Sequence, residues 1–142
     1  MNYQSIRAKI EAPLLTAYNS QVPSVPVYFD NIIAVPPDAP KEYVRINVTF
    51  GLTTEATLES SLDYPRGALI IRCFTPKDKG PARCQEMIRL AKQVIDTLNL
   101  ANKTSDSTYI RIGQISGPSF QMPDNIPHFV GVISAGWQAS PK

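Results

Sequence analysis

Two spacings of apolar residues recur along the chain, one typical of helices and one typical of strands. Over residues 2–20 the apolar positions follow one another at steps of four, four and three, on one helical face: Ile6, Ile10, Leu14 and Ala17. Pro13 falls inside this segment and removes an interior hydrogen bond, so we expect a kink or a break into two short helices there.

Three runs of β-branched and aromatic residues follow, and they predict three strands. The first, residues 25–33, lies between proline clusters, and the second, residues 42–51, alternates strictly between apolar and polar positions. The third, residues 67–76, carries Leu69, Ile71 and Cys73 on one face. Its other face is also largely apolar, with Ala68, Ile70 and Phe74 interrupted by Arg72. We therefore expect this strand to be central or to meet a partner chain.

A long helix and at least two more strands complete the pattern. Gly80 and Pro81 suit the N-cap and first helical positions, and one apolar stripe follows them: Met87, Ile88, Ala91, Val94, Ile95 and Leu98. Alternation returns at residues 108–115 and 128–139. Strands grouped around one central helix predict an α+β fold in which residues 1–142 form one domain: a mostly antiparallel sheet of about five strands, packed by an N-terminal helix and a long central helix.

The charge and cysteine content exclude several classes of protein. Fourteen Lys and Arg residues against twelve Asp and Glu residues give a net charge of +2, which argues against DNA binding by charge alone. Two cysteines at unrelated positions indicate free thiols in a protein made in a reducing compartment. No apolar run approaches the ~20 residues that a membrane span needs, and the N-terminus lacks a signal-peptide stretch, so we expect no membrane partner.

Catalytic and metal-binding constellations are not evident. His128 is the only histidine, and next to Pro127 it is better explained as a strand-edge residue than as a general base. Cys73 and Cys84 match no metal-ligand spacing and fit buried thiols. We therefore predict no enzyme activity, with no catalytic residue, metal or cofactor.

Two groups of residues are candidates for a contact surface. Lys77, Lys79 and Arg83 stand near the start of the long helix, where they form either a solvated connection or a surface for an acidic or phosphate-bearing partner. Apolar residues also occupy two stretches expected to be connections: Leu58, Leu62, Phe120, Met122 and Ile126. They fit a surface between chains or a lid over the core equally well.

The chain as a whole resembles a family of small phage tail-terminator or tail-completion proteins. The resembling segments are NYQSIRAKIEAPLLTAYN, VPVYFDN, EYVRINVTFGLTTEATL, RGALIIRCFTPKDKGPAR and the ending GPSF…PHFVGVISAGWQA. They cover most of the chain but contain no short invariant signature, so no individual functional residue is carried over.

The resemblance implies an α+β subunit and a virion structural role. The expected assembly is a homohexameric ring that caps the tail tube at its head-proximal end, with DNA passing through the lumen without specific binding. Its partners would be further copies of itself, the tail tube protein and the head-completion or neck proteins, after synthesis in the host bacterial cytoplasm. The alternatives are a head-tail connector or neck protein and, from a different class, a small-ligand binding module.

Overall fold

A computed structural model describes residues 3–21, 24–30, 42–55, 63–77, 80–102, 109–123 and 127–140. Its elements are α1 (Tyr3–Asn19), β1 (Val27–Tyr28), β2 (Tyr43–Glu55), β3 (Asp63–Pro76), α2 (Ala82–Asn102), β4 (Tyr109–Gln121) and β5 (His128–Ser140). The strands form one sheet in the order β1-β2-β3-β5-β4, in which β1 runs parallel to β2 and every other neighbouring pair is antiparallel. The predicted α+β class is confirmed, and β3 is central, which is one of the two positions that its two-sided apolar pattern predicted.

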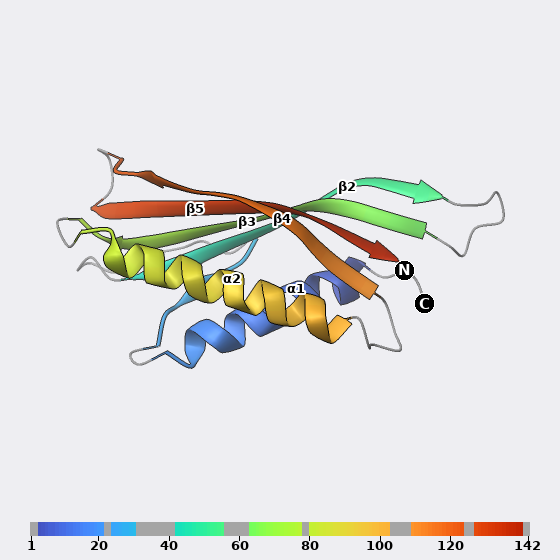
Figure 1. Cartoon of the computed structure of the whole chain (residues 1–142), viewed down its shortest axis with the longest axis horizontal. Helices are drawn as coiled ribbons and strands as arrows, with labels where there is room; N and C mark the ends of the chain where they lie inside the picture. The colour runs from blue at the N-terminus through green and yellow to red at the C-terminus, as the bar shows by residue number, and fades with distance from the viewer. Residues whose placement is uncertain are drawn as a thin grey trace.

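Both helices lie on the same side of the sheet (Figure 1). The sheet residues that face them form the core, and these include Val44, Ile46, Leu69, Ile71 and Ile133, each at most 3% exposed. Strict alternation along the strands produces this one-sided burial, because successive side chains point to opposite faces. No helix in the described part of the chain covers the opposite face of the sheet.

The first helix differs from its prediction in two ways. It is one helix from Tyr3 through Pro13 to Asn19, so the predicted break into two helices is absent. Ile10 and Leu14, on either side of the proline, are both buried, and this packing offsets the hydrogen bond that Pro13 removes. The last buried position is Tyr18, whereas Ala17 is only half-buried.

The second helix begins one residue later than predicted. The backbone N–H of Gln85 donates to the carbonyl of Pro81 at 3.0 Å, so Pro81 occupies the N-cap position and Ala82 is the first helical residue. Gly80 precedes it with φ of 77°, a left-handed conformation that glycine adopts without a steric penalty. The helix has 21 residues and is therefore about 30 Å long. Neither described helix is long and apolar enough to cross a membrane.

The boundaries of four strands also differ from the sequence prediction. The first strand is limited to Val27–Tyr28, and residues 31–33 of the predicted strand lie outside the described residues. β2 and β3 extend into the polar stretch between them, and β4 continues to Gln121 through a segment predicted to be a connection. Backbone pairing with a neighbouring strand extends β2, β3 and β4 beyond their apolar patterns.

Candidate functional site

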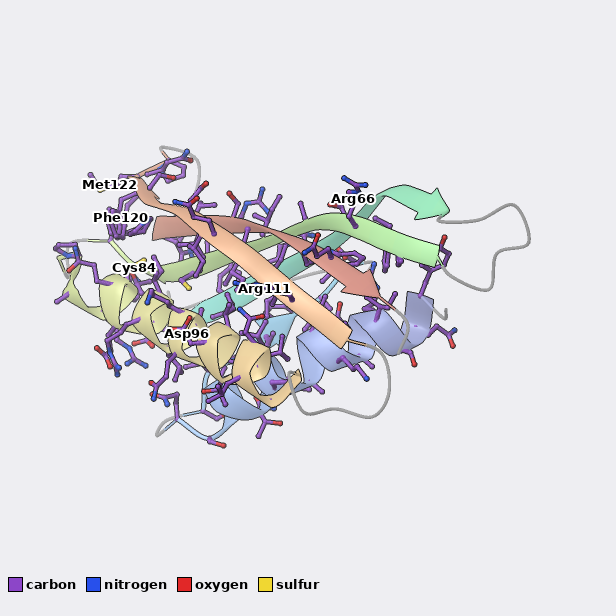
Figure 2. The ribbon with its side chains drawn as sticks, turned by 45° about the vertical axis from the view of Figure 1, so that its right-hand side comes forward. Arg66, Cys84, Asp96, Arg111, Phe120 and Met122 are labelled. Atoms are coloured by element: carbon purple, nitrogen blue, oxygen red, sulfur yellow. The ribbon has the colours of Figure 1, made fainter. Side chains whose placement is uncertain are left out.

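The predicted contact residues that the structure describes are Lys77, Arg83, Phe120 and Met122. Leu58, Leu62, Lys79 and Ile126 lie outside the described residues. Lys77, Phe120 and Met122 gather at the end of the sheet near the start of α2. Figure 2 shows Phe120 and Met122 at the same end of the molecule as Cys84, which is in the first turn of α2.

The two basic residues of this group make contacts within the chain. The ammonium of Lys77 donates to the backbone carbonyl of Pro123, which ties the end of β3 to the segment after β4. The guanidinium Nε of Arg83 donates to a carboxylate oxygen of Glu42 at 2.7 Å, and both side chains are about one-third exposed. Both cations therefore connect segments of the chain that are far apart in the sequence.

The two apolar residues have different environments. Phe120 lies in β4 rather than in a connection, is half-buried, and stacks on Phe129 with ring centroids 5.5 Å apart. Met122 is 62% exposed. It lines a hollow of about 340 Å³ together with Pro76, Gly80, Pro81 and Phe129, which we call the Met122 hollow. Among the predicted contact residues that the structure describes, Met122 is therefore the best placed to meet another molecule.

A larger apolar groove runs between the two helices. It has a volume of about 1050 Å³, and small side chains of α1, including Ala8, Ala12 and Ala17, face Leu90 and Val94 of α2 across it. Pattern analysis of either helix alone did not find this groove. It exists only because α1 and α2 lie side by side beneath the sheet.

The open face of the sheet is partly apolar. Ala68, Ile70 and Phe74 of β3 and Val132 of β5 are half-buried on this face, and the registers place Ile70 opposite Ser134 and Val132 opposite Arg72. Half-exposed aliphatic side chains in the centre of a sheet are typical of a surface that packs against something.

The buried thiols are unsuited to nucleophilic chemistry. Cys84 Sγ donates to the Cys73 carbonyl at 3.5 Å, and Tyr18 Oη lies 3.9 Å from Cys73 Sγ. Burial raises the pKa of Cys73 from 9.0 to about 12, and burial also raises the pKa of Cys84. Both groups stay protonated at neutral pH, whereas a reactive cysteine needs the thiolate. The prediction of free, buried thiols is confirmed.

His128 is part of an aromatic cluster. Only 1% of it is exposed, and its ring meets Tyr43 and Phe74 edge-on, with centroids 5.2 and 6.1 Å away. Tyr43 and Phe74 stack on each other at 4.3 Å. His128 does begin β5, as predicted, but it is enclosed by rings rather than exposed at an edge. Among the described residues, no three His, Cys, Asp or Glu side chains converge as a metal site would require.

Comparison with known proteins supports the fold. No protein-family model matches the chain, and neither does any curated protein. A solved structure at 24% sequence identity aligns over 98% of this chain and 96% of its own chain, with a TM-score of 0.65. The description of that protein states no activity. At this level of identity the likeness shows a shared fold, an α+β arrangement with a mostly antiparallel sheet.

Proposed function

We propose that this chain is a virion structural protein that acts as a tail terminator. In this role, copies of the chain form a ring that caps the last ring of the tail tube, stops its growth and joins it to the head-completion proteins. The proposal takes its biological setting from the resemblance of most of the chain to small phage tail proteins. Its physical support comes from the surfaces described above.

The observation that carries the proposal is the presence of two dissimilar contact surfaces on opposite sides of one subunit. One is the open sheet face around Ile70 and Val132, and the other is the groove between α1 and α2. Both helices lie on one side of the sheet, so these two surfaces face in opposite directions (Figure 1). A closed head-to-tail ring requires two different patches on each copy, because one patch of each subunit meets the other patch of its neighbour. The exposed Met122 at the end of the sheet is a third point of contact, available to the tube or to the neck.

The mass of the purified full chain in solution, alone and with tail tube protein, tests this proposal. Native mass spectrometry and light scattering should detect a ring, and electron microscopy should show that ring at tube ends. A chain that remains monomeric at every concentration and leaves tubes uncapped would overturn the proposal. Density for the chain between the tail and the head connector, away from the tube end, would assign it to the neck instead.

A pair of variants of α1 makes the test specific. Ala12 lines the groove, so Ala12→Glu places a charge in an apolar surface that the proposal expects to be covered by a neighbour. Ser5 is exposed on the same helix and does not line the groove, so Ser5→Glu is the matched control. Ring formation should be lost in the first variant and kept in the second, with both variants folded by circular dichroism.

A further inference from the structure

β4 is the last strand of the sheet, and one of its two edges has no neighbouring strand. β5 pairs with one edge, and in the part of the chain that the structure describes no strand pairs with the other, which we call the outer edge of β4. β4 has 13 residues, whereas an average strand has about five or six. Figure 2 shows β4 as the front ribbon of the sheet, with Arg111 and Phe120 labelled along it. The outer edge is therefore a long row of backbone groups.

The contacts of Asn99 show which residues face the outer edge. Asn99 of α2 donates from Nδ2 to the Ile112 carbonyl and accepts from the Ile112 N–H through Oδ1, both at 2.8 Å. The N–H and C=O groups of one residue in an antiparallel ladder point to the same side of the strand. The register places Ile115 and Phe120, like Ile112, opposite odd-numbered residues of β5. The backbone groups of Ile115 and Phe120 therefore also point outward.

This part of the outer edge lacks the charges that commonly protect an edge strand. Residues 112–123 include no Asp, Glu, Lys or Arg. Charged side chains at a sheet edge oppose pairing with another chain. At the edge of β2, by contrast, the charged side chains of Arg7 and Asp30 bond to the backbone of Val48. The outer edge of β4 is thus the less protected of the two edges.

A bulge limits how another strand can pair with this edge. The second register shift of β4 contains Gly117 and Pro118, and proline has no backbone N–H to donate. Ile115 and Phe120 lie on either side of this shift. A partner strand must therefore form its hydrogen bonds in two short arms, one at Ile115 and one at Phe120.

The segment that holds these two arms is symmetric in residue type. Residues 115–120 read ISGPSF, with an apolar residue at each end and a serine next to each. A twofold axis through its middle places Ile115 opposite Phe120 of a second copy, and Ser116 opposite Ser119. The two outward-facing residues then meet each other, as a hydrogen-bonded antiparallel pair requires. Ile115 and Phe120 are half-buried, and a β-branched side chain opposite an aromatic ring stabilises a sheet.

We propose that a second copy of this chain pairs antiparallel with the outer edge of β4 about this twofold axis, so that the two sheets join into one. Such a contact uses the same surface on both copies and needs no other partner. It differs from the head-to-tail contacts of the proposed ring, so it does not rest on the proposed function.

Disulfide crosslinking of mixed copies tests the register. Ser116 and Ser119 are exposed, so Ser116→Cys and Ser119→Cys each leave the core unchanged. In a mixture the two introduced thiols face each other across the axis, with Cα atoms about 4.5 Å apart, within the reach of a disulfide. Two copies of either variant alone hold their introduced thiols roughly 10 Å apart. Oxidation of the mixture with diamide should therefore give several-fold more covalent dimer than oxidation of either variant alone.

Thr49→Cys is the control for this experiment. Thr49 is exposed on β2, so a mixture of Thr49→Cys and Ser116→Cys should give no more dimer than Ser116→Cys alone. Cys73 and Cys84 are buried and contribute no crosslink. Equal yields in the two mixtures would overturn the inference. Rings or capped tubes that form without a crosslink between positions 116 and 119 would also overturn it, while leaving the tail-terminator proposal intact.

Removal of one outward N–H separates edge pairing from folding. Phenyllactic acid in place of Phe120 keeps the ring and replaces this N–H with an ester oxygen, so the melting temperature of the monomer should not change. Each copy in the dimer loses a donor, and dimerisation measured by analytical ultracentrifugation should weaken roughly tenfold. The same replacement at Phe129, whose N–H faces β3, should lower the melting temperature instead. Unchanged dimerisation of the chain with the Phe120 ester would overturn the inference.

Discussion

Asp30 accepts a hydrogen bond from the backbone N–H of Val48 at 3.0 Å, and with Arg7 it closes the free edge of β2. The Arg7 guanidinium donates to the Val48 carbonyl at 3.0 Å and to Asp30 at 2.6 Å. In the described part of the chain, β1 pairs with β2 only at Val44 and Arg45, and Val48 lies beyond these pairs. Two side chains therefore occupy the place of a neighbouring strand, which protects an edge that would otherwise pair with other chains.

Removing the Asp30 carboxylate should both destabilise the chain and expose this edge. We expect Asp30→Ala to lower the free energy of unfolding by about 1–2 kcal/mol, because the Val48 N–H and Arg7 lose a charged acceptor that is only partly screened by solvent. Urea denaturation measures the loss, and light scattering should show faster aggregation. Asp96→Ala, which breaks an exposed pair with Lys92, should change stability by no more than about 0.5 kcal/mol. Equal effects of the two changes would contradict the edge role.

The hydroxyl of Tyr18 joins the two helices. It is fully buried and donates to the backbone carbonyl of Met87 at 2.7 Å. Tyr18→Phe keeps the ring and removes this bond, so we expect a loss of about 1 kcal/mol in the free energy of unfolding. Tyr3→Phe is the matched control, because Tyr3 is 55% exposed. A Tyr18→Phe protein as stable as the parent chain would mean that hydrogen bonds within α2 already satisfy the Met87 carbonyl.

Stability should fall as the solution becomes alkaline. Burial raises the pKa of Cys73 to about 12 and moves the pKa of Tyr18 upward as well. A group whose pKa is higher in the folded chain than in the unfolded chain holds its proton more tightly when folded. Its contribution to the free energy of unfolding is therefore complete below its pKa in the unfolded chain and is lost as the pH rises through its pKa in the folded chain. For Cys73 the loss should run from about pH 9 to about pH 12. Urea midpoints across this range measure the decline, which should be shallower in Cys73→Ala. An identical decline in that variant would assign the effect to other groups.

The glycines of the sheet should differ sharply in their tolerance of a side chain. A Cβ on Gly67 would fall onto the backbone carbonyl of Thr49 and lie 2.9 Å from the Trp137 ring, so Gly67→Ala should lose several kcal/mol or fail to fold. Gly136→Ala should be neutral, or stabilising by about 0.5 kcal/mol, because it restricts the unfolded chain without a clash. Thermal melting of Gly67→Ala and Gly136→Ala measures this difference in stability, and similar melting temperatures for the two variants would contradict it.

Met122 gives a prediction about assembly rather than stability. Because its side chain is 62% exposed, Met122→Lys should leave the melting temperature of the monomer unchanged. If the Met122 hollow contacts the tube, this variant should cap tail tubes poorly in electron micrographs. Leu100→Lys changes an equally exposed residue at the far end of α2 and should cap tubes normally. Loss of capping in both variants would indicate a general effect of added charge.

The periodicity of the sequence predicted the α+β class and most buried positions of both helices. It left the strand at residues 67–76 either central or in contact with a partner chain, and the structure shows that it is central. These features follow from local rules. Apolar side chains that recur every two residues in a strand, or every 3.6 residues in a helix, lie on one face, and that face is buried. The same rules supported free, buried thiols, because two isolated cysteines match no ligand spacing. Of the candidate contact residues, Met122 was identified from the sequence as an apolar side chain in an expected connection, and in the structure it is 62% exposed.

Only the tertiary structure decided which residues far apart in sequence share a surface. The long course of β4 depends on its pairing with β5, and the burial of Tyr18 instead of Ala17 depends on where α2 lies. Gly51, Gly113 and Gly136 of three strands line one hollow in the sheet, and strand register brings them together without any signal in a local window of the sequence. Side-chain periodicity acts over a few residues, whereas strand order and helix placement are settled by contacts across the whole chain.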